Sequence, residues 1–569
     1  MASPAFPEAD RSIPETTLAE ADAIVARLGE KKDAWVRVGI PERIALLKAC
    51  LRGTMGVAQD WVTAACSAKG IPRDAELAGE EMLGGPWTTV RNIRLLIEAL
   101  ESGGKPRPPK LYQRGDGQWV GRVFPATLMD RALYTGFEGE VWIEPGASPS
   151  QGGIYQKKAS GSYGEGKVSL VLGAGNVASI GPMDALYKLF VEDEVVILKM
   201  NPVNEYLGPF LLRAFACLKD AGYFDVVYGG AVIGGHLAHH DGVHSIHMTG
   251  SDRTHDAIVW GGSPEEQERR KAADEPLLTK PITSELGCVT PLFIVPGPWS
   301  ASEMDFQARH VAAMVAHNGS FNCNAAKVLV TPKDWDQRDA FLAKVREKLR
   351  DIRARRAYYP GAQARYQGFL DRYPQAEPMG DRTDDVVPWT LIPDVPAEEG
   401  EYALSNEAFC GVLAQIDIPG KDAAEFLANA VPFANESIWG TLSCMMLIHP
   451  DTQREHAAAF DKALKDLRYG GIGVNVWAGV IYGLVVTTWG AHPGHTLKDI
   501  RSGIGVVHNT YLFDHPQKSV VKAPFVIKPT PLWFADHGNL RATSDKILEW
   551  ESDPSWLKVP GVAINAFRG

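Results

Sequence analysis

The stretch Val168-Ser-Leu-Val-Leu-Gly-Ala-Gly-Asn-Val177 decides how this chain folds. Its first five residues predict a buried strand, and the glycines after them predict a turn at the strand's end. A helical pattern over Pro182–Val191 follows, and then a second apolar run, Val195–Lys199. A strand, a helix and a strand at this short spacing are typical of a parallel sheet with crossover helices.

The same alternation continues toward residue 260. We expect helices over Leu207–Ala221 and from Ser251 onward, and strands over Val226–Tyr228 and Ser245–Thr249. Ligands of such a sheet bind beyond the carboxyl ends of the strands. The residues that fall at these ends are Asn176, Lys199, Gly229 and Gly250. Neither the G-x-G-x-x-G fingerprint nor a phosphate-binding P-loop is present, so the turns alone do not identify the ligand.

The regions that precede this unit have a different texture. Helical patterns over Glu15–Leu28, Pro41–Arg52 and Trp87–Leu100 predict a helical cover. Between about 103 and 166, glycine, proline and short alternating runs such as Glu140–Glu144 predict strands, hairpins or an inserted arm.

Composition excludes several classes of protein. The chain has 569 residues, with 58 Lys and Arg against 69 Asp and Glu, which gives a formal net charge of −11. This mild acidity argues against a broad basic face for nucleic acid or an anionic membrane. The seven scattered cysteines form no C-x-x-C pair and lack histidines at metal-ligand spacing, so we expect neither a disulfide framework nor a metal site.

One segment, Tyr469–Leu497, contains no charged residue. Its uninterrupted apolar run, Val476–Val486, is much shorter than the roughly 20 residues of a membrane-spanning helix. We therefore expect a buried strand-and-loop region rather than a membrane span. The segment Met1–Arg11 lacks the basic and apolar pattern of a secretory signal, so a cytoplasmic location is expected.

Two motifs farther along carry chemistry. Glu285-Leu-Gly287 opens an apolar run, and Asn318-Gly-Ser-Phe-Asn-Cys-Asn-Ala325 places Cys323 just before a strand-like stretch. With these motifs the chain resembles the aldehyde dehydrogenase superfamily from about Pro41 to Gly505. Further matches, in chain order, are Asn176, Lys199, Met248–Ser251, Asn406–Phe409 and Arg501–Gly503.

The resemblance implies an α/β fold with a Rossmann-type cofactor domain, an α/β catalytic domain and an oligomerisation arm. It suggests a cofactor domain over residues 1–284, with the arm at about 112–166. A catalytic domain would span residues 285–475. Residues 476–569 would return to the cofactor domain and supply oligomerisation strands or a C-terminal extension.

The resemblance also implies roles for three catalytic residues in oxidising an aldehyde to an acid. Cys323 would be the nucleophile, and lowering its pKa to about 7 would make it about half thiolate at neutral pH. The side-chain amide of Asn176 would stabilise the oxyanion, and Glu285 would be the base that activates water. Without the resemblance, each would be read as an ordinary core, turn or salt-bridge residue.

The implied cofactor is NAD or NADP. Lys199 would reach its ribose, Glu407 would bind the nicotinamide ribose and Phe409 would flank the nicotinamide. The remaining positions expected to contact it are Gly229, Gly230, Gly250, Ser251 and Leu286. Many NAD-preferring relatives have Glu three residues after the lysine, where this chain has Pro202, yet Lys199–Pro209 contains no second Lys or Arg to attract a 2′-phosphate. We therefore place NAD ahead of NADP.

Departures from the family motifs lie near the expected nicotinamide pocket. Cys288 replaces a glycine, the E-x-F motif continues as Cys410-Gly411, and Ser320-Phe321 replaces a Gly-Gln pair before the thiol. By the resemblance, these positions shape the nicotinamide pocket.

The expected partners are a small-molecule aldehyde and further copies of the chain. Phe321, Trp477 and Tyr482 are candidates to line an apolar tunnel, while aromatic residues at this density also suit a plain core. We expect a homodimer or a homotetramer. We expect no nucleic acid partner, no membrane span and no bound metal. Two alternatives remain open: a CoA-acylating enzyme or acyl-CoA reductase of the same fold, and a non-catalytic nucleotide-binding scaffold.

Overall fold

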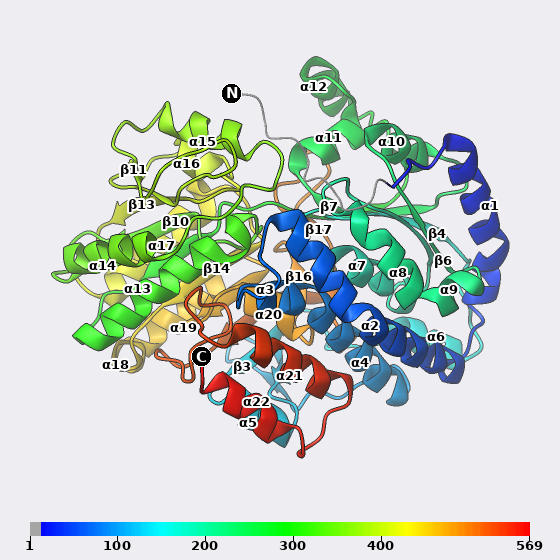
Figure 1. The fold of residues 1–569 in the computed structure, drawn as a ribbon, viewed down its shortest axis with the longest axis horizontal. Coiled ribbons are helices and arrows are strands. Elements are labelled where there is room, and N and C mark those ends of the chain that lie inside the picture. Colours follow the sequence, from blue (N-terminus) through cyan, green and yellow to red (C-terminus); the bar gives the residue numbers. More distant parts are fainter. Residues whose placement is uncertain (1–12) are drawn as a thin grey trace.

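A computed structural model describes residues 13–569, and the segment Met1–Arg11 discussed above lies outside the described residues. Two sheets organise the chain, and helices cover both of them (Figure 1). This arrangement confirms the α/β fold class. No helix of the described residues is long and apolar enough to cross a membrane.

The smaller sheet contains the two strands that the sequence predicts between residues 168 and 199. Its strand order is β17-β8-β7-β4-β5-β6, and every neighbouring pair is parallel except β17 with β8. The strands are β4 (Val168–Leu172), β5 (Val195–Lys199), β6 (Phe224–Val227), β7 (Ser245–Gly250), β8 (Ile282–Leu286) and β17 (Gly503–Ile504).

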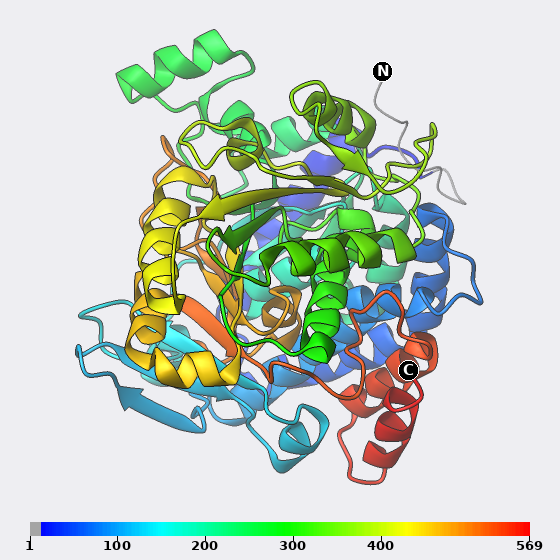
Figure 2. The same cartoon turned by 90° about the vertical axis from the view of Figure 1, so that its left-hand side faces the viewer.

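Helices from two parts of the chain cover this sheet. Those of the strand–helix alternation are α7 (Ile180–Phe190), α8 (Gly208–Ala214), α9 (Ala216–Asp220), α10 (Ala231–His239), α11 (Asp252–Trp260) and α12 (Pro264–Ala273), with the 3-10 turn η2 (Glu205–Leu207). The N-terminal cover comprises α1 (Leu18–Trp35), α2 (Ile40–Lys69), α3 (Ala78–Met82), the π-helical turn η1 (Leu83–Trp87) and α4 (Thr88–Glu101). Helix α12 projects from the body of the molecule (Figure 2).

Two helix predictions were wrong in extent. The helix expected over Leu207–Ala221 is broken at Phe215, whose φ and ψ of −108° and 26° are not helical. The helix expected to end at Arg52 continues to Lys69, because buried Trp61 and Val62 extend its apolar stripe.

The larger sheet has eleven strands in the order β1-β2-β3-β19-β15-β14-β9-β10-β13-β12-β11. From β19 to β12 all neighbours are parallel. The strands are β1 (Lys110–Gln113), β2 (Trp119–Phe124), β3 (Glu138–Ile143), β9 (Pro291–Ile294), β10 (Val328–Pro332), β11 (Glu377–Pro378), β12 (Thr390–Ile392), β13 (Val412–Ile418), β14 (Ser443–Leu447), β15 (Gly471–Val474) and β19 (Pro516–Lys522).

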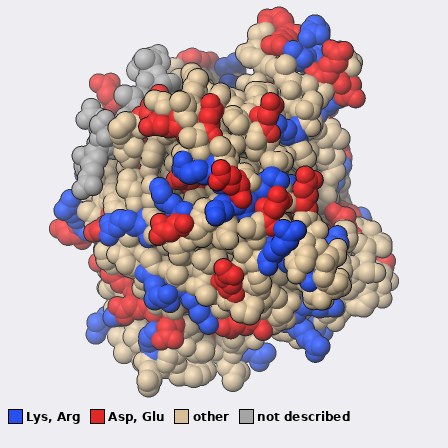
Figure 3. Space-filling view, turned by 90° about the vertical axis from the view of Figure 1, so that its right-hand side faces the viewer, with Lys and Arg blue, Asp and Glu red and all other residues tan. Residues whose placement is uncertain are grey.

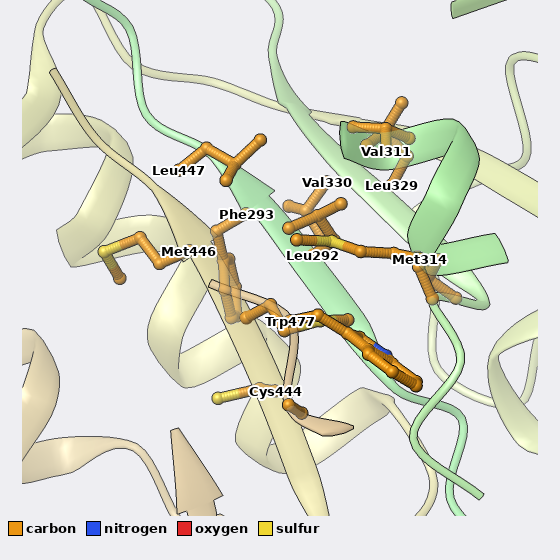
Figure 4. Packing of buried hydrophobic residues seen from close by; sticks show 14 of the residues in the cluster. Leu292, Phe293, Val311, Met314, Leu329, Val330, Cys444, Met446, Leu447 and Trp477 are labelled. Atoms are coloured by element: carbon orange, nitrogen blue, oxygen red, sulfur yellow. The ribbon is translucent and has the colours of Figure 1, made fainter. Parts of the chain in front are cut away.

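The core of this sheet is built from apolar side chains of adjacent strands. Phe293 of β9 pairs with Met446 of β14, and Met314 of α13 (Ala301–Ala316) reaches toward Leu292 (Figure 4). The other elements of this half are the 3-10 turn η3 (His317–Ser320), α14 (Arg338–Asp351), α15 (Ala362–Leu370), α16 (Tyr402–Ser405), α17 (Ala423–Ser437), α18 (Pro450–Glu455) and α19 (Ala457–Asp466).

The expected arm does not stand apart from the sheets. Strand β3 pairs antiparallel with β19 of the same chain, so β1, β2 and β3 extend the larger sheet. The arm also carries α5 (Leu128–Leu133) and α6 (Gly153–Ala159). The predicted boundary between 284 and 285 passes through β8, and of the last predicted segment only β17 returns to the smaller sheet.

The charge-free segment folds as expected into short buried elements. It contains β15, α20 (Gly479–Leu484) and β16 (Thr488–Gly490), which pairs with β18 (Val506–His508). After β19, the chain crosses to α21 (Leu540–Ser552) and α22 (Val559–Ala566), which lie against the N-terminal cover and α5 (Figure 1).

Charges on the surface are mixed. On the face shown in Figure 3, lysine and arginine are interspersed with aspartate and glutamate, and no broad patch of one sign stands out. This distribution agrees with the argument from composition.

Candidate active site

The two motif residues Cys323 and Glu285 meet between the two sheets. Glu285 lies near the carboxyl end of β8, and Cys323 lies in the loop that joins η3 to β10. The Cys323 Sγ donates a hydrogen bond to Glu285 Oε1 at 3.4 Å. The thiol and the carboxylate that sequence reasoning assigned as nucleophile and base are therefore in direct contact.

Burial changes the acidity of both groups. It raises the pKa of Glu285 to about 7, and the nearby Asp184 carboxylate adds to the effect. Burial also raises the pKa of the Cys323 thiol well above its usual range, and the negative charge of Glu285 adds to this shift. The lowered thiol pKa that we considered from the sequence is not what this environment produces, because the carboxylates of Glu285 and Glu407 raise it and no cation within residues 13–569 counters them. The structure instead offers Glu285 as an acceptor for the thiol proton.

The loop that carries Cys323 is held in an unusual conformation. Asn318, Gly319 and Ser320 all have left-handed backbone angles, with φ of 53°, 67° and 69°. The buried Lys327 donates to the Ser320 carbonyl at 3.1 Å and to its hydroxyl at 2.8 Å. Non-glycine residues in this region cost free energy and persist only where their surroundings fix them. The lysine is one of those fixed points.

Asn176 lies close to the same loop. Its side-chain Nδ2 donates to the Phe321 carbonyl at 2.9 Å, two residues before the thiol. Its backbone carbonyl accepts hydrogen bonds from Lys69 Nζ at 3.2 Å and from Asn318 Nδ2 at 3.0 Å. Asn176 also lines a cavity together with Cys323. The amide is thus placed near the thiol, as its predicted oxyanion role requires.

The network that fixes Asn176 centres on a buried lysine at the end of α2. Lys69 Nζ also donates to Glu81 Oε1 at 2.9 Å and to Asn318 Oδ1 at 3.0 Å. Tyr358 donates from its hydroxyl to the same Asn318 oxygen at 3.0 Å. These bonds tie the first turn of the smaller sheet to the thiol loop.

A cavity of about 690 Å³ runs from the strand ends of the smaller sheet to Cys323. It contains seven of the eight residues predicted to bind the cofactor: Lys199, Gly230, Gly250, Ser251, Leu286, Glu407 and Phe409. The exception is Gly229, which does not line the cavity. A side chain there would meet Ile233 and Glu15, so its φ of 129° marks a turn rather than a contact surface.

Lys199 ends β5 inside this cavity. Burial lowers the pKa of its ammonium group to about 8, while the carboxylates of Glu205 and Glu15 oppose that shift. Neither acid was predicted from the sequence to lie near Lys199. Glu205 stands six residues after the lysine, in the same window that we searched only for basic residues.

Glu407 lies at the inner end of the cavity. Its carboxylate lies directly over Gly287, where a side chain would come within 2.0 Å of Oε2. The Oε1 atom is buried without a partner, and burial raises the pKa of this acid to about 7. Glu285 Oε2 is likewise unpartnered. Two carboxylate oxygens without a partner among residues 13–569, in a cavity lined by both polar and apolar groups, fit a ligand that carries hydroxyl groups, as a nicotinamide nucleotide does.

A second cavity, of about 310 Å³, reaches Cys323 from the other side. Trp477 and Tyr482 line it, as the sequence suggested, and so does much of the charge-free segment. Phe321 does not, so its assignment is corrected. Its ring packs against Tyr358 and Tyr359, at centroid distances of 4.9 and 5.9 Å, because the left-handed turn before it points the side chain into that cluster.

A mixed α/β fold with a thiol and a carboxylate in contact where two cavities meet defines an enzyme that acts on a small molecule. The sequence profile of the "Aldehyde dehydrogenase family" matches residues 186–364. A search among functionally curated proteins found no match.

Solved structures share the fold over nearly the whole chain. One is an NADP-dependent glyceraldehyde-3-phosphate dehydrogenase from Bacillus halodurans C-125, with 18% identity over 91% of this chain and 95% of that chain and a TM-score of 0.61. Another is an NAD-dependent aldehyde dehydrogenase from Sinorhizobium meliloti, with 17% identity, 93% and 92% coverage and a TM-score of 0.61. Aldehyde dehydrogenase 21 from Physcomitrella patens has 13% identity, 91% and 93% coverage and a TM-score of 0.62. The profile covers less than half of the chain, and these solved structures show that the chain shares their fold.

Proposed function

We propose that this protein oxidises an aldehyde to a carboxylic acid through a covalent intermediate on Cys323. The observation that carries the proposal is the position of the thiol, which lies in contact with Glu285 at the junction of a polar and an apolar cavity. A substrate in the apolar cavity and a nucleotide in the polar one would both reach the sulfur.

The chain's own residues account for the proton movements. Glu285 accepts the thiol proton, the sulfur adds to the aldehyde carbon, and the carbonyl oxygen becomes an oxyanion beside the Asn176 amide. When bound, NAD or NADP supplies the acceptor for the hydride that leaves this adduct, and a thioester on Cys323 remains. Glu285 releases the thiol proton to solvent and then takes a proton from water, whose oxygen attacks the thioester; the C–S bond breaks, the carboxylic acid leaves, and the proton held by Glu285 returns to the Cys323 sulfur.

Residues of the larger cavity would hold the cofactor. Lys199 would bind the adenosine ribose, and Glu407 would accept hydrogen bonds from the nicotinamide ribose. We propose NAD rather than NADP, because the Glu205 and Glu15 carboxylates that act on Lys199 would repel a 2′-phosphate.

Product analysis tests the reaction. We expect a free acid to form from an aldehyde and NAD without CoA, and we expect Cys323→Ala to abolish acid formation while the variant still binds NAD. Strict dependence on CoA would favour the acylating alternative, although the presence of Glu285 argues for water. Full activity of Cys323→Ala would contradict the covalent mechanism.

A further inference from the structure

The apolar cavity at Cys323 is almost free of ionisable groups. Of the described residues that line it, only Lys528 carries a fixed charge, and this lysine is exposed. His317 is half-buried, and loss of hydration lowers the pKa of its imidazole, which favours the neutral form. A charged substrate tail would therefore lose its hydration here without gaining a charged partner inside the cavity.

Two aromatic side chains of the wall near the thiol have their polar atoms occupied by the protein, whereas Trp87 Nε1, Tyr134 OH, Asn324 Oδ1 and Trp533 Nε1 have no partner among residues 13–569. Trp477 donates its indole N–H to the Asn324 carbonyl at 3.1 Å, and the Tyr482 hydroxyl bonds to Ser179 Oγ at 2.8 Å. These rings consequently present carbon surface to the cavity. Because most of the lining is apolar, the wall suits methylene groups better than phosphate or carboxylate groups.

The outer half of the cavity is made by the end of the chain described above as α21 and α22. Its lining residues there come from Ile527–Trp533, from Ile547 of α21, and from Val562, Ala563, Ala566 and Phe567 at α22. This segment is firmly anchored. The buried Glu551 of α21 pairs with Arg91 of α4 at 2.9 Å, and Arg91 also donates to the carbonyl of Leu484, itself a wall residue.

The mouth of the cavity is marked by the lining residues that are exposed: Ala132, Thr135, Lys528 and Phe567. Apolar side chains are also exposed on α5 and α22, the helices that carry or adjoin Ala132 and Phe567. Phe567 is 73% exposed, Ile564 on α22 is 53% exposed, and Leu128 at the start of α5 is 69% exposed. We call Leu128, Ile564 and Phe567 the apolar rim. The rim continues the cavity's surface outward.

We propose that the substrate is an aldehyde with a linear hydrocarbon tail, and that residues 527–567 form the outer half of the site that binds this tail. The inference rests on the proposed function, since it orients the aldehyde group toward Cys323. The tail would pass Trp477 and Tyr482, leave the cavity between α5 and α22, and end on the apolar rim.

A chain-length series tests the substrate class. We expect kcat/KM to rise from acetaldehyde to dodecanal, by about fourfold for each methylene that enters the cavity, and then to level off. A flat series, or one that favours short or phosphorylated aldehydes, would overturn the inference while leaving the proposed function intact. If no aldehyde is oxidised, the proposed function itself fails.

A binding measurement separates the two proposals further. Dodecanol cannot be oxidised as an aldehyde, so its quenching of tryptophan fluorescence reports the tail site alone. We expect saturable binding of dodecanol and none of butanol at the same concentration. Equal responses to both alcohols would contradict a site for a long tail.

Two variants test the role of the C-terminal segment. Ala563→Phe fills the cavity from α22, and we expect at least a tenfold loss of kcat/KM for dodecanal with little change for acetaldehyde. The matched control is Ala273→Phe, an equal addition at the exposed end of α12. Equal losses for both aldehydes would place the segment outside the tail site.

The rim is tested with Leu128→Ser/Phe567→Ser, with Tyr163→Ser as a control that removes an exposed ring elsewhere. We expect the preference for long aldehydes to fall and the molecular mass in light scattering to stay the same. A change in mass with an unchanged chain-length preference would show that the rim joins two copies of the chain, which would overturn its role in tail binding.

Discussion

The two cavities that meet at Cys323 differ in one property above all. The larger one is bordered by groups that carry or exchange charge, among them Lys199, Glu285, Glu407 and Arg365. The smaller one has a single exposed lysine among its lining residues. Acidic and basic side chains are therefore far more numerous around the cavity proposed for the cofactor than around the cavity proposed for the tail.

Among the residues of the two cavities, we expect substitution of Glu285, the proposed base, to have the largest effect. In Glu285→Gln we expect hydrolysis of the thioester to slow by about a hundred- to ten-thousandfold, the range of a lost general base. The raised pKa of Glu285 fixes the sign of the pH dependence: the carboxylate is protonated below about 7 and free above it, so wild-type turnover should rise through about pH 7. The variant should lose this rise, as stopped-flow and steady-state pH profiles would reveal.

The oxyanion donor should have the next largest effect. Asn176→Ala removes one amide donor and should lower kcat by about a hundred- to a thousandfold. The aldehyde KM should change much less, because the amide acts on charge that develops after binding. A loss below tenfold would refute the assignment of Asn176.

Substitution of Lys69 should affect both cavities, because its ammonium group donates hydrogen bonds to the Asn176 carbonyl and to Asn318 of the thiol loop. Lys69→Met leaves Glu81 buried without its partner and should lower the free energy of unfolding by about 3–5 kcal/mol. As a positioning residue, it should also reduce kcat more than KM.

The matched control for Lys69→Met is the double variant Lys69→Met/Glu81→Leu. It should recover stability in denaturant titrations without recovering kcat. Recovery of both quantities would show that the lysine acts on stability alone.

The smallest effect is expected at the outer end of the polar cavity. Glu205→Gln removes one charge near Lys199 and should shift the ratio of kcat/KM for NADP and NAD by about fivefold toward NADP, which corresponds to ~1 kcal/mol for a partly exposed charge. The measurement is a pair of cofactor titrations at fixed aldehyde. An unchanged ratio would contradict the basis for preferring NAD.

Much of the smaller sheet could be predicted from local pattern. Strands β4 and β5 coincide with the apolar runs at 168–172 and 195–199, because buried parallel strands require continuous apolar sequence. The motifs placed Cys323, Glu285 and Asn176, and the structure brings all three together.

Other parts could not be read from local sequence. Lys69 lies far from Cys323 in the chain, and nothing in α2 distinguishes it from a surface lysine until the helix docks on the thiol loop. The direction of the Phe321 ring depends on three left-handed residues before it. The pairing of β3 with β19 depends on distant strands, for which local patterns give no register.

The order of elements along the chain has a consequence for synthesis. The apolar cavity is lined early by Trp87 and Leu133 and later by Trp477, yet its outer wall and β19, which joins β3 to β15, come after all of them. A chain still on the ribosome therefore holds these aromatic surfaces open to water until residues 516–567 emerge. The two halves of the larger sheet become one only when β19 inserts between β3 and β15.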